Sequence, residues 1–389
     1  MHGHCRAVRI VLGLVLALTG AVAVTPDARA LAPQALAPPG VPWTWGGNSY
    51  GQLGIGTTSP RLVPGPVSTL GDVVDLHGGR EHVAALRSDG SVWVWGSNVQ
   101  GQLGLGTSGN RLTPTRVTSL SGAVAVETGH NHTVVLLGNG TVWTAGLNSD
   151  GQLGDGTTTN RRSFVRVQGL SDAVLIAAGR DMSYAVRADG TVVGWGRNAE
   201  GQLGDGTTTR RLTPVRVGQL TNVTAIAGGR DHGLAVRSDG TVWAWGANTY
   251  GQVGDGSQTN RRAPVQVASG AVDVSAGAHH SLALRADGRV QSWGRNYRTE
   301  LGDGTTTNRS RPVFVLNVSG ATSIGAGRDT GMAVLGDGTV RVWGHNASGQ
   351  LGDGTTTNRS TPIVLRGVSG ATKAAGGGAA YSTVLVDHR

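Results

Sequence analysis

The sequence predicts an all-β protein, a seven-bladed β-propeller with four-stranded antiparallel blades whose ring is closed by pairing of the N- and C-terminal strands. Three observations support this fold. A unit of about 50 residues recurs seven times, apolar residues alternate within each unit, and the two ends of the chain carry complementary fragments of one unit. No segment after the first 40 residues has the periodicity of an amphipathic helix.

The repeat is anchored by a glycine that is followed two places later by asparagine. Successive copies are 50 residues apart, except for one step of 48. Most copies continue with Gly-Gln-Leu-Gly and Asp-Gly-Thr-Thr-Thr-Asn-Arg, then a proline-valine stretch, an apolar run and Trp-x-Trp-Gly. The anchoring glycines are Gly46, Gly96, Gly146, Gly196, Gly246, Gly294 and Gly344.

One unit, residues 223–267, shows why four strands are expected. The segments VTAIA and DHGLAVR alternate in polarity, and the Ser-Asp-Gly at 238–240 predicts a tight turn in which glycine supplies a positive φ. The next segment, TVWAWG, places Trp243 and Trp245 on one face of a strand. A fourth strand is expected over Pro264–Val267, with proline at its start, where no ladder hydrogen bond is lost.

The two ends of the chain predict a closed ring. Residues 41–46 (VPWTWG) match one strand of the unit, and residues 379–389 (AAYSTVLVDHR) match the strand that precedes it. Their pairing would complete a seventh blade and leave no open edge. We therefore expect a propeller over residues 41–389, preceded by a linker rich in proline and alanine over residues 31–40.

Residues 1–30 indicate a secretory signal peptide. Arg6 and Arg9 precede an apolar run of about 15 residues, and Ala28-Arg29-Ala30 fits a cleavage site. The run is shorter than the ~20 residues that a spanning helix needs, so we expect a secreted protein with no membrane span after cleavage. Cleavage also removes Cys5, the only cysteine, which excludes disulfides and thiolate metal sites from the mature chain.

The charge does not favour a nucleic-acid partner. The formal net charge is +9, and loss of three arginines and one aspartate with the signal peptide leaves +7. Arginines and aspartates recur together at fixed repeat positions, as is typical of a solvated face. No basic run or known nucleic-acid motif accompanies them. We expect a monomer that does not bind nucleic acid.

Ten tryptophans, mostly in Trp-x-Trp pairs, are expected to pack between the blades. Each ring buries about 200 Å², which at ~25 cal/mol per Å² is worth up to ~5 kcal/mol. Since aromatic residues at strand spacing usually belong to the core, we interpret them as packing residues rather than as a ligand site.

Two short motifs resemble catalytic or cofactor sites. Residues 47–51 satisfy the Gly-x-Ser-x-Gly of a hydrolase, and residues 104–109 satisfy the Gly-x-Gly-x-x-Gly of a dinucleotide-binding turn. No helical pattern follows either one. Chemistry at Ser49 is also inconsistent with its equivalents in the other copies, which are Val99, Ser149, Ala199, Thr249, Tyr297 and Ala347. We expect no catalytic residue and no cofactor.

Two sets of residues offer metal ligands. Four histidines, His82, His132, His232 and His280, occupy equivalent positions and would be arranged around a ring. Met182, Thr330 and Ala380 occupy the same position in other copies, so we expect histidines satisfied by nearby backbone groups. The Asp-Gly-Thr-Thr-Thr-Asn-Arg loops carry oxygen ligands for calcium, but Asx-type turns explain them without an ion. We expect no metal.

The repeat resembles that of the regulator of chromosome condensation family. The resemblance is carried by Trp-Gly-x-Asn-x-x-Gly-Gln-Leu-Gly, as at residues 95–104 and, with valine in place of leucine, at 245–254, and by Gly-x-x-His-x-x-Ala-Leu at residues 277–284. It covers residues 41–387 and implies a seven-bladed propeller. Kelch repeats share the period but differ in their glycines and aromatic spacing.

The resemblance implies three activities. Members include a guanine-nucleotide exchange factor for a small GTPase, an ultraviolet-B photoreceptor and secreted bacterial inhibitors of β-lactamases. The exchange factor acts through an inserted wedge, whereas the spacing here is uniform. The photoreceptor's Gly-Trp-Arg-His-Thr motifs are absent, and the inhibitors have shorter repeats.

The favoured function is a secreted, non-catalytic scaffold that binds another macromolecule, most readily a protein. Equivalent loop positions within an otherwise constant frame carry different chemistry, as binding surfaces on rigid scaffolds do. Aromatic and arginine members are the expected anchors. The candidate binding residues are Tyr50, Gln100, Asp150, Glu200, Tyr250, Tyr297, Arg298 and Ser348.

Four alternatives stay open at this point. The loop residues could vary only because they are unconstrained in solvent. The chain could instead be a propeller inhibitor of an extracellular enzyme such as a β-lactamase, or a regulator of the guanine-nucleotide exchange type. It could also be an extracellular hydrolase or a polysaccharide-binding enzyme module.

Overall fold

A computed structural model of the protein describes residues 36–378 and 380–387. The predicted signal peptide, residues 1–30, lies outside this part of the chain. The described residues form 28 β-strands and no helix, which confirms the all-β prediction. The described residues therefore include no apolar helix of the length needed to span a bilayer.

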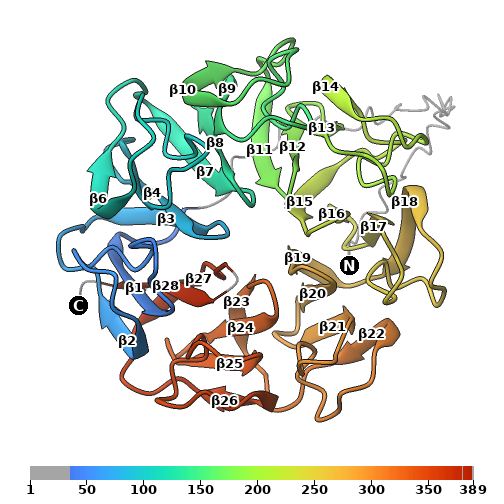
Figure 1. Ribbon diagram of the computed structural model, residues 1–389. Coiled ribbons are helices and arrows are strands. Elements are labelled where there is room, and N and C mark those ends of the chain that lie inside the picture. The colour runs from blue at the N-terminus through green and yellow to red at the C-terminus, as the bar shows by residue number, and fades with distance from the viewer. Residues whose placement is uncertain (1–35, 379, 388–389) are drawn as a thin grey trace, which may run out of the picture. The chain divides into compact units, whose positions relative to one another are not determined.

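Seven blades of four antiparallel strands surround a central axis (Figure 1). In each blade the first strand lines the axis and the fourth lies at the rim. The blades are, in order, β3 (Val73–Gly78), β4 (His82–Arg87), β5 (Val92–Gly96) and β6 (Arg111–Arg116); β7 (Ala123–Thr128), β8 (His132–Leu137), β9 (Val142–Gly146) and β10 (Arg161–Arg166); β11 (Ala173–Ala178), β12 (Met182–Arg187), β13 (Val192–Gly196) and β14 (Arg211–Arg216); β15 (Val223–Gly228), β16 (His232–Arg237), β17 (Val242–Gly246) and β18 (Arg261–Ala268); β19 (Ala271–Ala276), β20 (His280–Arg285), β21 (Val290–Gly294) and β22 (Arg309–Phe314); β23 (Ala321–Ala326), β24 (Thr330–Leu335), β25 (Val340–Gly344) and β26 (Arg359–Val364); and the closing blade β27 (Ala371–Ala374), β28 (Tyr381–Asp387), β1 (Gly40–Gly46) and β2 (Arg61–Pro66).

Closure by the two ends of the chain is confirmed. β1 pairs antiparallel with β28 along its whole length, from Gly40 opposite Asp387 to Gly46 opposite Tyr381. The prediction that the N-terminal segment supplies one strand was incomplete. After the loop that follows Gly46 the chain returns as β2, with Arg61 opposite Gly46, so each end contributes two strands to the closing blade.

The outermost strands begin earlier than predicted. β18 starts at Arg261, and Pro264 lies inside it rather than at its start. The pairing with β17 shifts register between Ala244 and Gly246. A proline is tolerated at such an irregular rim strand because its missing N–H costs no regular ladder bond.

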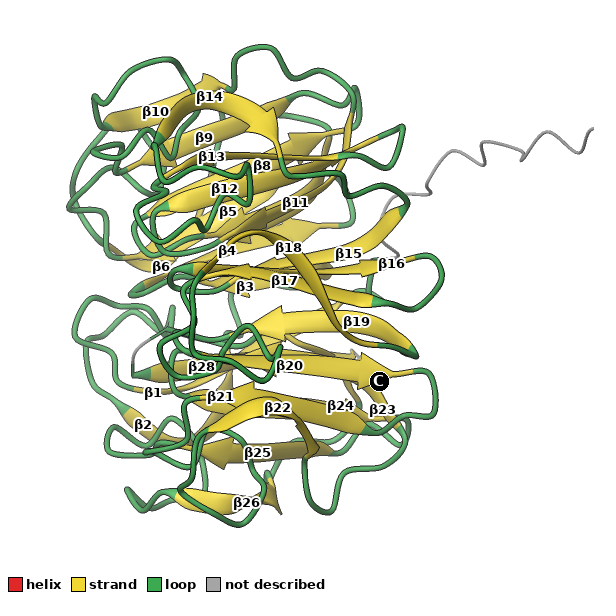
Figure 2. Ribbon diagram, turned by 90° about the vertical axis from the view of Figure 1, so that its right-hand side faces the viewer, coloured by secondary structure: helices red, strands yellow, loops and turns green. Residues whose placement is uncertain are grey.

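The core is divided among the interfaces between neighbouring blades, which Figure 2 shows as twisted sheets stacked side by side. The described residues form seven hydrophobic clusters, and each takes its members from two adjacent blades. In one of them Tyr184 meets Trp245 edge-on, with ring centroids 5.7 Å apart. The predicted packing of tryptophans between blades is therefore confirmed.

Hydrogen bonds from the buried indoles fix the spacing of the blades. The Nε1 of Trp245 donates to the carbonyl oxygen of Gln202 in the preceding blade at 2.8 Å. The same bond recurs six times around the ring, from Trp45, Trp95, Trp195, Trp245, Trp293 and Trp343. Each bond satisfies a buried donor and holds a loop of one blade against the sheet of the next.

The ring has two distinct faces and a hollow centre. The turn before each second strand and the long loop after each third strand emerge on the same side, because the start of β4 pairs with the end of β5. We call this side the loop face and the other the hairpin face. The first strands of all seven blades line a central channel whose cavity measures about 1050 Å³.

Candidate functional site

Side chains of the repeat frame hold each long loop in one shape. In the loop after β17, the N–H of Val253 donates to Asn248 Oδ1 at 2.9 Å, and Asn248 Nδ2 donates to the carbonyl of Thr259 at 3.0 Å. The N–H of Tyr250 donates to Gln252 Oε1 at 2.9 Å. The frame residues are buried, so the variable residue between them lies at the loop tip.

All eight predicted binding residues lie in these loops on the loop face, and the structure brings two of them into contact next to a third. Tyr250 and Tyr297, from adjacent blades, meet edge-on with centroids 5.8 Å apart, and Arg298 follows Tyr297 in the chain. The other five are spread around the ring. Two of those five bond an asparagine of the next blade, through Gln100 to Asn160 at 2.8 Å and Glu200 to Asn260 at 2.7 Å.

The aromatic pair continues into a third ring. Tyr250 also meets His279 at 5.1 Å between centroids, and the Arg295 guanidinium lies 5.9 Å from the Tyr250 centroid. Tyr297 is 62% exposed. The cluster is thus fixed on its inner side and open to solvent on its outer side.

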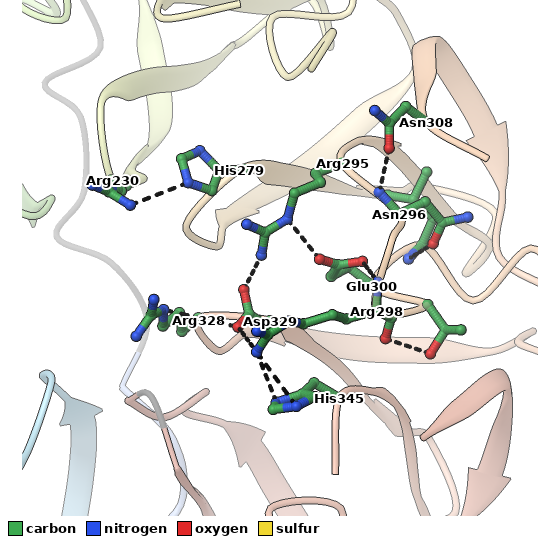
Figure 3. A network of polar contacts seen from close by, with 12 residues as sticks. Arg230, His279, Arg295, Asn296, Arg298, Glu300, Asn308, Arg328, Asp329 and His345 are labelled. Atoms are coloured by element: carbon green, nitrogen blue, oxygen red, sulfur yellow. Dashed lines mark hydrogen bonds and ion pairs between the residues drawn. The ribbon is translucent and has the colours of Figure 1, made fainter. Parts of the chain in front are cut away.

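Arg295 belongs to a group of three arginines that surround two buried carboxylates (Figure 3). Arg295 bonds both Asp329 and Glu300, its Nε lying 2.8 Å from Glu300 Oε1. Arg298 Nη1 lies 3.3 Å from Asp329 Oδ2, and Arg328 Nε lies 3.8 Å from the same carboxylate. Burial raises the pKa of Glu300 while Arg295 opposes that shift.

Arg298 is held from two sides but stays accessible. Its backbone N–H donates to Glu300 Oε2 at 2.8 Å, and its Nη1 lies 3.4 Å from His345 Nε2. Burial and the charge of Arg298 lower the pKa of His345, so the histidine is neutral and can accept this bond. We call Tyr250, His279, Arg295, Tyr297 and Arg298 the Tyr-Arg cluster.

The loop that carries Arg298 departs from the repeat at two further positions. Thr299 has φ = 66° where the other loops have glycine, for example Gly251 at 81°. A β-branched residue in the left-handed region costs about 1–3 kcal/mol, and such strain is retained mostly at functional positions. Glu300 replaces the frame glutamine and supplies the second buried carboxylate.

Replacing Thr299 by glycine should raise the free energy of unfolding by about 1 kcal/mol, because the left-handed backbone is then unstrained. The converse change, Gly251→Thr, should lower it, since a Cβ there would lie 2.6 Å from the Cα of Ser310. Urea unfolding of both variants measures the two shifts. A Thr299→Gly variant with lower stability would show that the loop is not strained.

The two motifs that resemble a catalytic site and a cofactor site, residues 47–51 and 104–109, lie in ordinary loops of the repeat. Ser49 is exposed at a loop tip, and within the described residues it has no hydrogen bond to a histidine or carboxylate. The glycines at 104–109 lead into strand β6 rather than a helix. Neither the strand-to-helix elbow nor the helix N-terminus that these chemistries need is present at these loops.

The four equivalent histidines are buried and lie in separate blades. The Nε2 atoms of His82, His132 and His232 each lie near a hydroxyl group of the next blade, a partner that was not predicted. Within the described residues neither ring nitrogen of His280 has a side-chain partner. His132 Nε2 lies 2.9 Å from Ser183 Oγ, and His82 Nε2 lies 3.1 Å from Thr133 Oγ1. Among the residues of known placement, no three histidine, cysteine or acidic side chains converge as metal ligands.

The acidic loops have the predicted local bonding. Asp155 Oδ1 accepts from the N–H of Thr157 at 3.0 Å and from its hydroxyl at 2.7 Å. Asp155 Oδ2 accepts from Arg161 Nε at 2.8 Å. Its acceptor positions are filled by protein donors, and the same arrangement recurs in later blades.

Sequence reasoning missed the deeper half of the cluster. Asp329 lies in the turn before β24 of the next blade, so only the assembled ring brings it to Arg298. His279 lies in the turn before β20 of the same blade, where the pairing of β20 with β21 places it beside Arg295. A signal was present in Thr299 and Glu300, which break the Gly-Gln frame of the other copies.

Comparison with known proteins agrees with this architecture. A family model described as RCC1-like domain matches residues 43–384. The structure is similar to Prp20p from Saccharomyces cerevisiae, studied for its binding to Gsp1p and histones, with 23% identity over 93% of this chain and 94% of that chain and a TM-score of 0.77. It is also similar to human WBSCR16, with 23% identity, 90% and 99% coverage and a TM-score of 0.78.

A third solved structure, yeast RCC1 (Prp20) bound to Kap60, has 22% identity over 99% of this chain and 97% of that chain, with a TM-score of 0.80. No protein of curated function matches the sequence significantly. At these identities the likeness establishes the fold.

Proposed function

Because the chain belongs to the RCC1-like domain family of β-propellers, we propose that it is a secreted, monomeric, non-catalytic scaffold that binds a protein partner through the Tyr-Arg cluster. Propellers of this fold include one solved in complex with the protein Kap60. The observation that carries the proposal is the contact of Tyr250 with the exposed Tyr297 on the loop face, next to Arg298, which bonds the buried Asp329.

The chemistry of the cluster suits a protein surface. Tyrosine and arginine dominate the energetics of protein interfaces because they combine large contact area with directional hydrogen bonds. Tyr297 offers an exposed ring, and Arg298 is 49% exposed. The buried Asp329 and Glu300 hold the arginines in position, so little side-chain entropy is lost on binding.

Affinity capture from the culture medium tests the proposal. The wild-type protein is expected to retain one partner, identified by mass spectrometry. The Tyr250→Ala/Arg298→Ala variant should bind that partner at least about 30-fold more weakly, since each anchor is worth about 1–2 kcal/mol or more. Binding is measured with purified components after the partner is identified.

A matched control separates the cluster from the loop face in general. Tyr50 is a tyrosine at an equivalent loop tip, and Arg166 is an exposed arginine on the rim strand β10. The Tyr50→Ala/Arg166→Ala variant should bind nearly as well as wild type. Equal binding by the cluster variant and this control would disprove the assignment. Hydrolysis of a substrate panel that is abolished by Ser49→Ala would disprove the non-catalytic role.

A further inference from the structure

Backbone hydrogen bonds link neighbouring turns around the loop-face mouth of the channel. The N–H of Arg80 donates to the carbonyl of His130 at 3.1 Å, and the N–H of His130 donates to the carbonyl of Arg180 at 3.2 Å. The N–H of Arg180 donates to the carbonyl of Gly229 at 3.1 Å. These bonds fix the side chains at this position relative to one another.

Four of the seven turns place an arginine at this position, and all four side chains line the cavity. They are Arg80, Arg180, Arg230 and Arg328, from the first, third, fourth and sixth blades. His130 occupies the position in the second blade. The mouth therefore carries a ring of guanidinium groups around the channel axis.

Each guanidinium has its Nε edge towards a neighbouring carboxylate. Arg180 Nε lies 2.9 Å from Asp181, and Arg230 Nε lies 3.3 Å from Asp231. Arg80 Nε lies 3.8 Å from Glu81, and Arg328 Nε lies 3.8 Å from Asp329. These neighbouring carboxylates orient the arginines by their Nε edges.

The Nη edges remain available. In the described part of the chain the Nη atoms of Arg80, Arg180 and Arg328 have no hydrogen-bond partner, and the side chains are 44%, 30% and 46% exposed. Arg230 Nη1 contacts only His279, at 3.3 Å. A guanidinium with two free Nη groups binds carboxylate or phosphate oxygens as a planar fork.

The surrounding charges favour an anion at the mouth and not deeper in the channel. Burial and then the charges of all four arginines lower the pKa of His130 to about 3. The four guanidinium groups therefore lie near this one histidine, which is neutral. Further in, Glu127 and Asp273 line the channel together with His77 and Lys373. His77 pairs with Glu127 and Lys373 pairs with Asp75, so both cations there are already held by carboxylates. Asp150, in the long loop of the second blade, also lines the mouth of the channel.

We propose that the loop-face mouth of the central channel is an oxyanion-binding site, in which the Nη edges of Arg80, Arg180, Arg230 and Arg328 hold a phosphate or carboxylate group. The site adjoins the Tyr-Arg cluster, because Arg230 Nη1 contacts His279 and Arg328 shares Asp329 with Arg298. It does not include the contact between Tyr250 and Tyr297. The group could belong to a free small anion or to an acidic segment of a bound protein.

Calorimetric titration at constant ionic strength with two probes, inorganic phosphate and a short oligoglutamate, tests the proposal and distinguishes these sources. The wild type should bind at least one probe. The Arg180→Gln/Arg230→Gln variant should bind it at least about tenfold more weakly. The control Arg166→Gln/Arg216→Gln removes the same charge from rim strands and should change binding by no more than about twofold.

Binding of phosphate alone identifies a free-anion site, and binding of oligoglutamate alone identifies a site for acidic protein segments. The ring resonances of His130, assigned with His130→Gln, should shift on ligand binding while those of His82 do not. If Arg180→Gln/Arg230→Gln does not fold, Arg80→Gln/Arg328→Gln makes the same test. Absence of binding by the wild type to either probe, or equal binding by the mouth and rim variants, would overturn the proposal.

Discussion

Lowering the pH from about 7 to about 4 should unfold the propeller in a cooperative transition. Burial lowers the pKa of His132 and His232 to about 3 and that of His82 and His280 to about 4. The unfolded chain therefore takes up protons near pH 6.5, well before the folded protein does. The stability that the neutral histidines contribute is fully present above pH 6.5. It falls as the pH drops towards the pKa values of these histidines in the folded protein.

The magnitude is large because four histidines act together. Each pKa unit is worth about 1.4 kcal/mol, so the expected loss between pH 6.5 and 4 is several kcal/mol, comparable with the stability of a typical domain. The rings cannot relax, since a Cβ added at Gly129 would lie 2.0 Å from Cε1 of His132. Within the described residues the Nδ1 of His132 has no partner, so an added proton has no acceptor.

The chain itself supplies the matched variants for this prediction. The third blade carries Met182 at the same position, so His232→Met should reduce the loss of stability at low pH. Met182→His should steepen it. Urea unfolding over a series of pH values measures both effects. A pH dependence that is unchanged in both variants would contradict the account.

Replacing Lys373 by methionine should lower the free energy of unfolding by about 3 kcal/mol, because it removes the bonded cation of the buried Asp75 carboxylate and leaves only His77, at 3.3 Å, to offset its charge. Lys373, on β27, bonds Asp75 on β3, and its Nζ lies 3.1 Å from His77 Nε2. Asp75 Oδ2 also accepts from the N–H of Val126 on β7 at 3.2 Å. The cluster thus ties the closing blade to the first and second blades.

The double variant Lys373→Met/Asp75→Asn is the control, since removing both charges should recover much of the loss. The cluster also has a pH signature at alkaline values. Burial opposes the protonated form of His77, but Glu127 at 3.2 Å and Asp75 outweigh it and raise its pKa to about 9. Its contribution is present below pH 6.5 and lost as the pH rises through 9.

Chemical denaturation of the three proteins near pH 7 and near pH 10 tests this account of ring closure. Wild type should lose stability at the higher pH. A Lys373→Met variant as stable as wild type would mean that the cluster does not hold the closing blade.

Much of the fold could be predicted because the repeat carries it. A glycine-asparagine frame repeated seven times determines the number of blades and the pairing of the ends, since each copy needs a neighbour to bury its tryptophan. The start of β18 at Arg261 could not be predicted, because the register shift near Ala244 depends on the partner strand. For the same reason, the sequence did not show that each end of the chain supplies two strands of the closing blade.

The candidate site could be predicted only in part. Loop positions pointed to Tyr250, Tyr297 and Arg298 because equivalent residues differ within one chain. Asp329 was missed because it belongs to a turn whose approach to Arg298 depends on the ring. Lys373 and Asp75 were missed for the same reason, since nearly three hundred positions separate them in the sequence.

Hydrogen exchange of the captured partner complex tests the central claim most directly. On binding, the loops that carry Tyr250 and Arg298 should become protected, and the turns of the hairpin face, such as residues 88–91, should exchange as in the free protein. Protection confined to the hairpin face, with the loop face unchanged, would contradict the account.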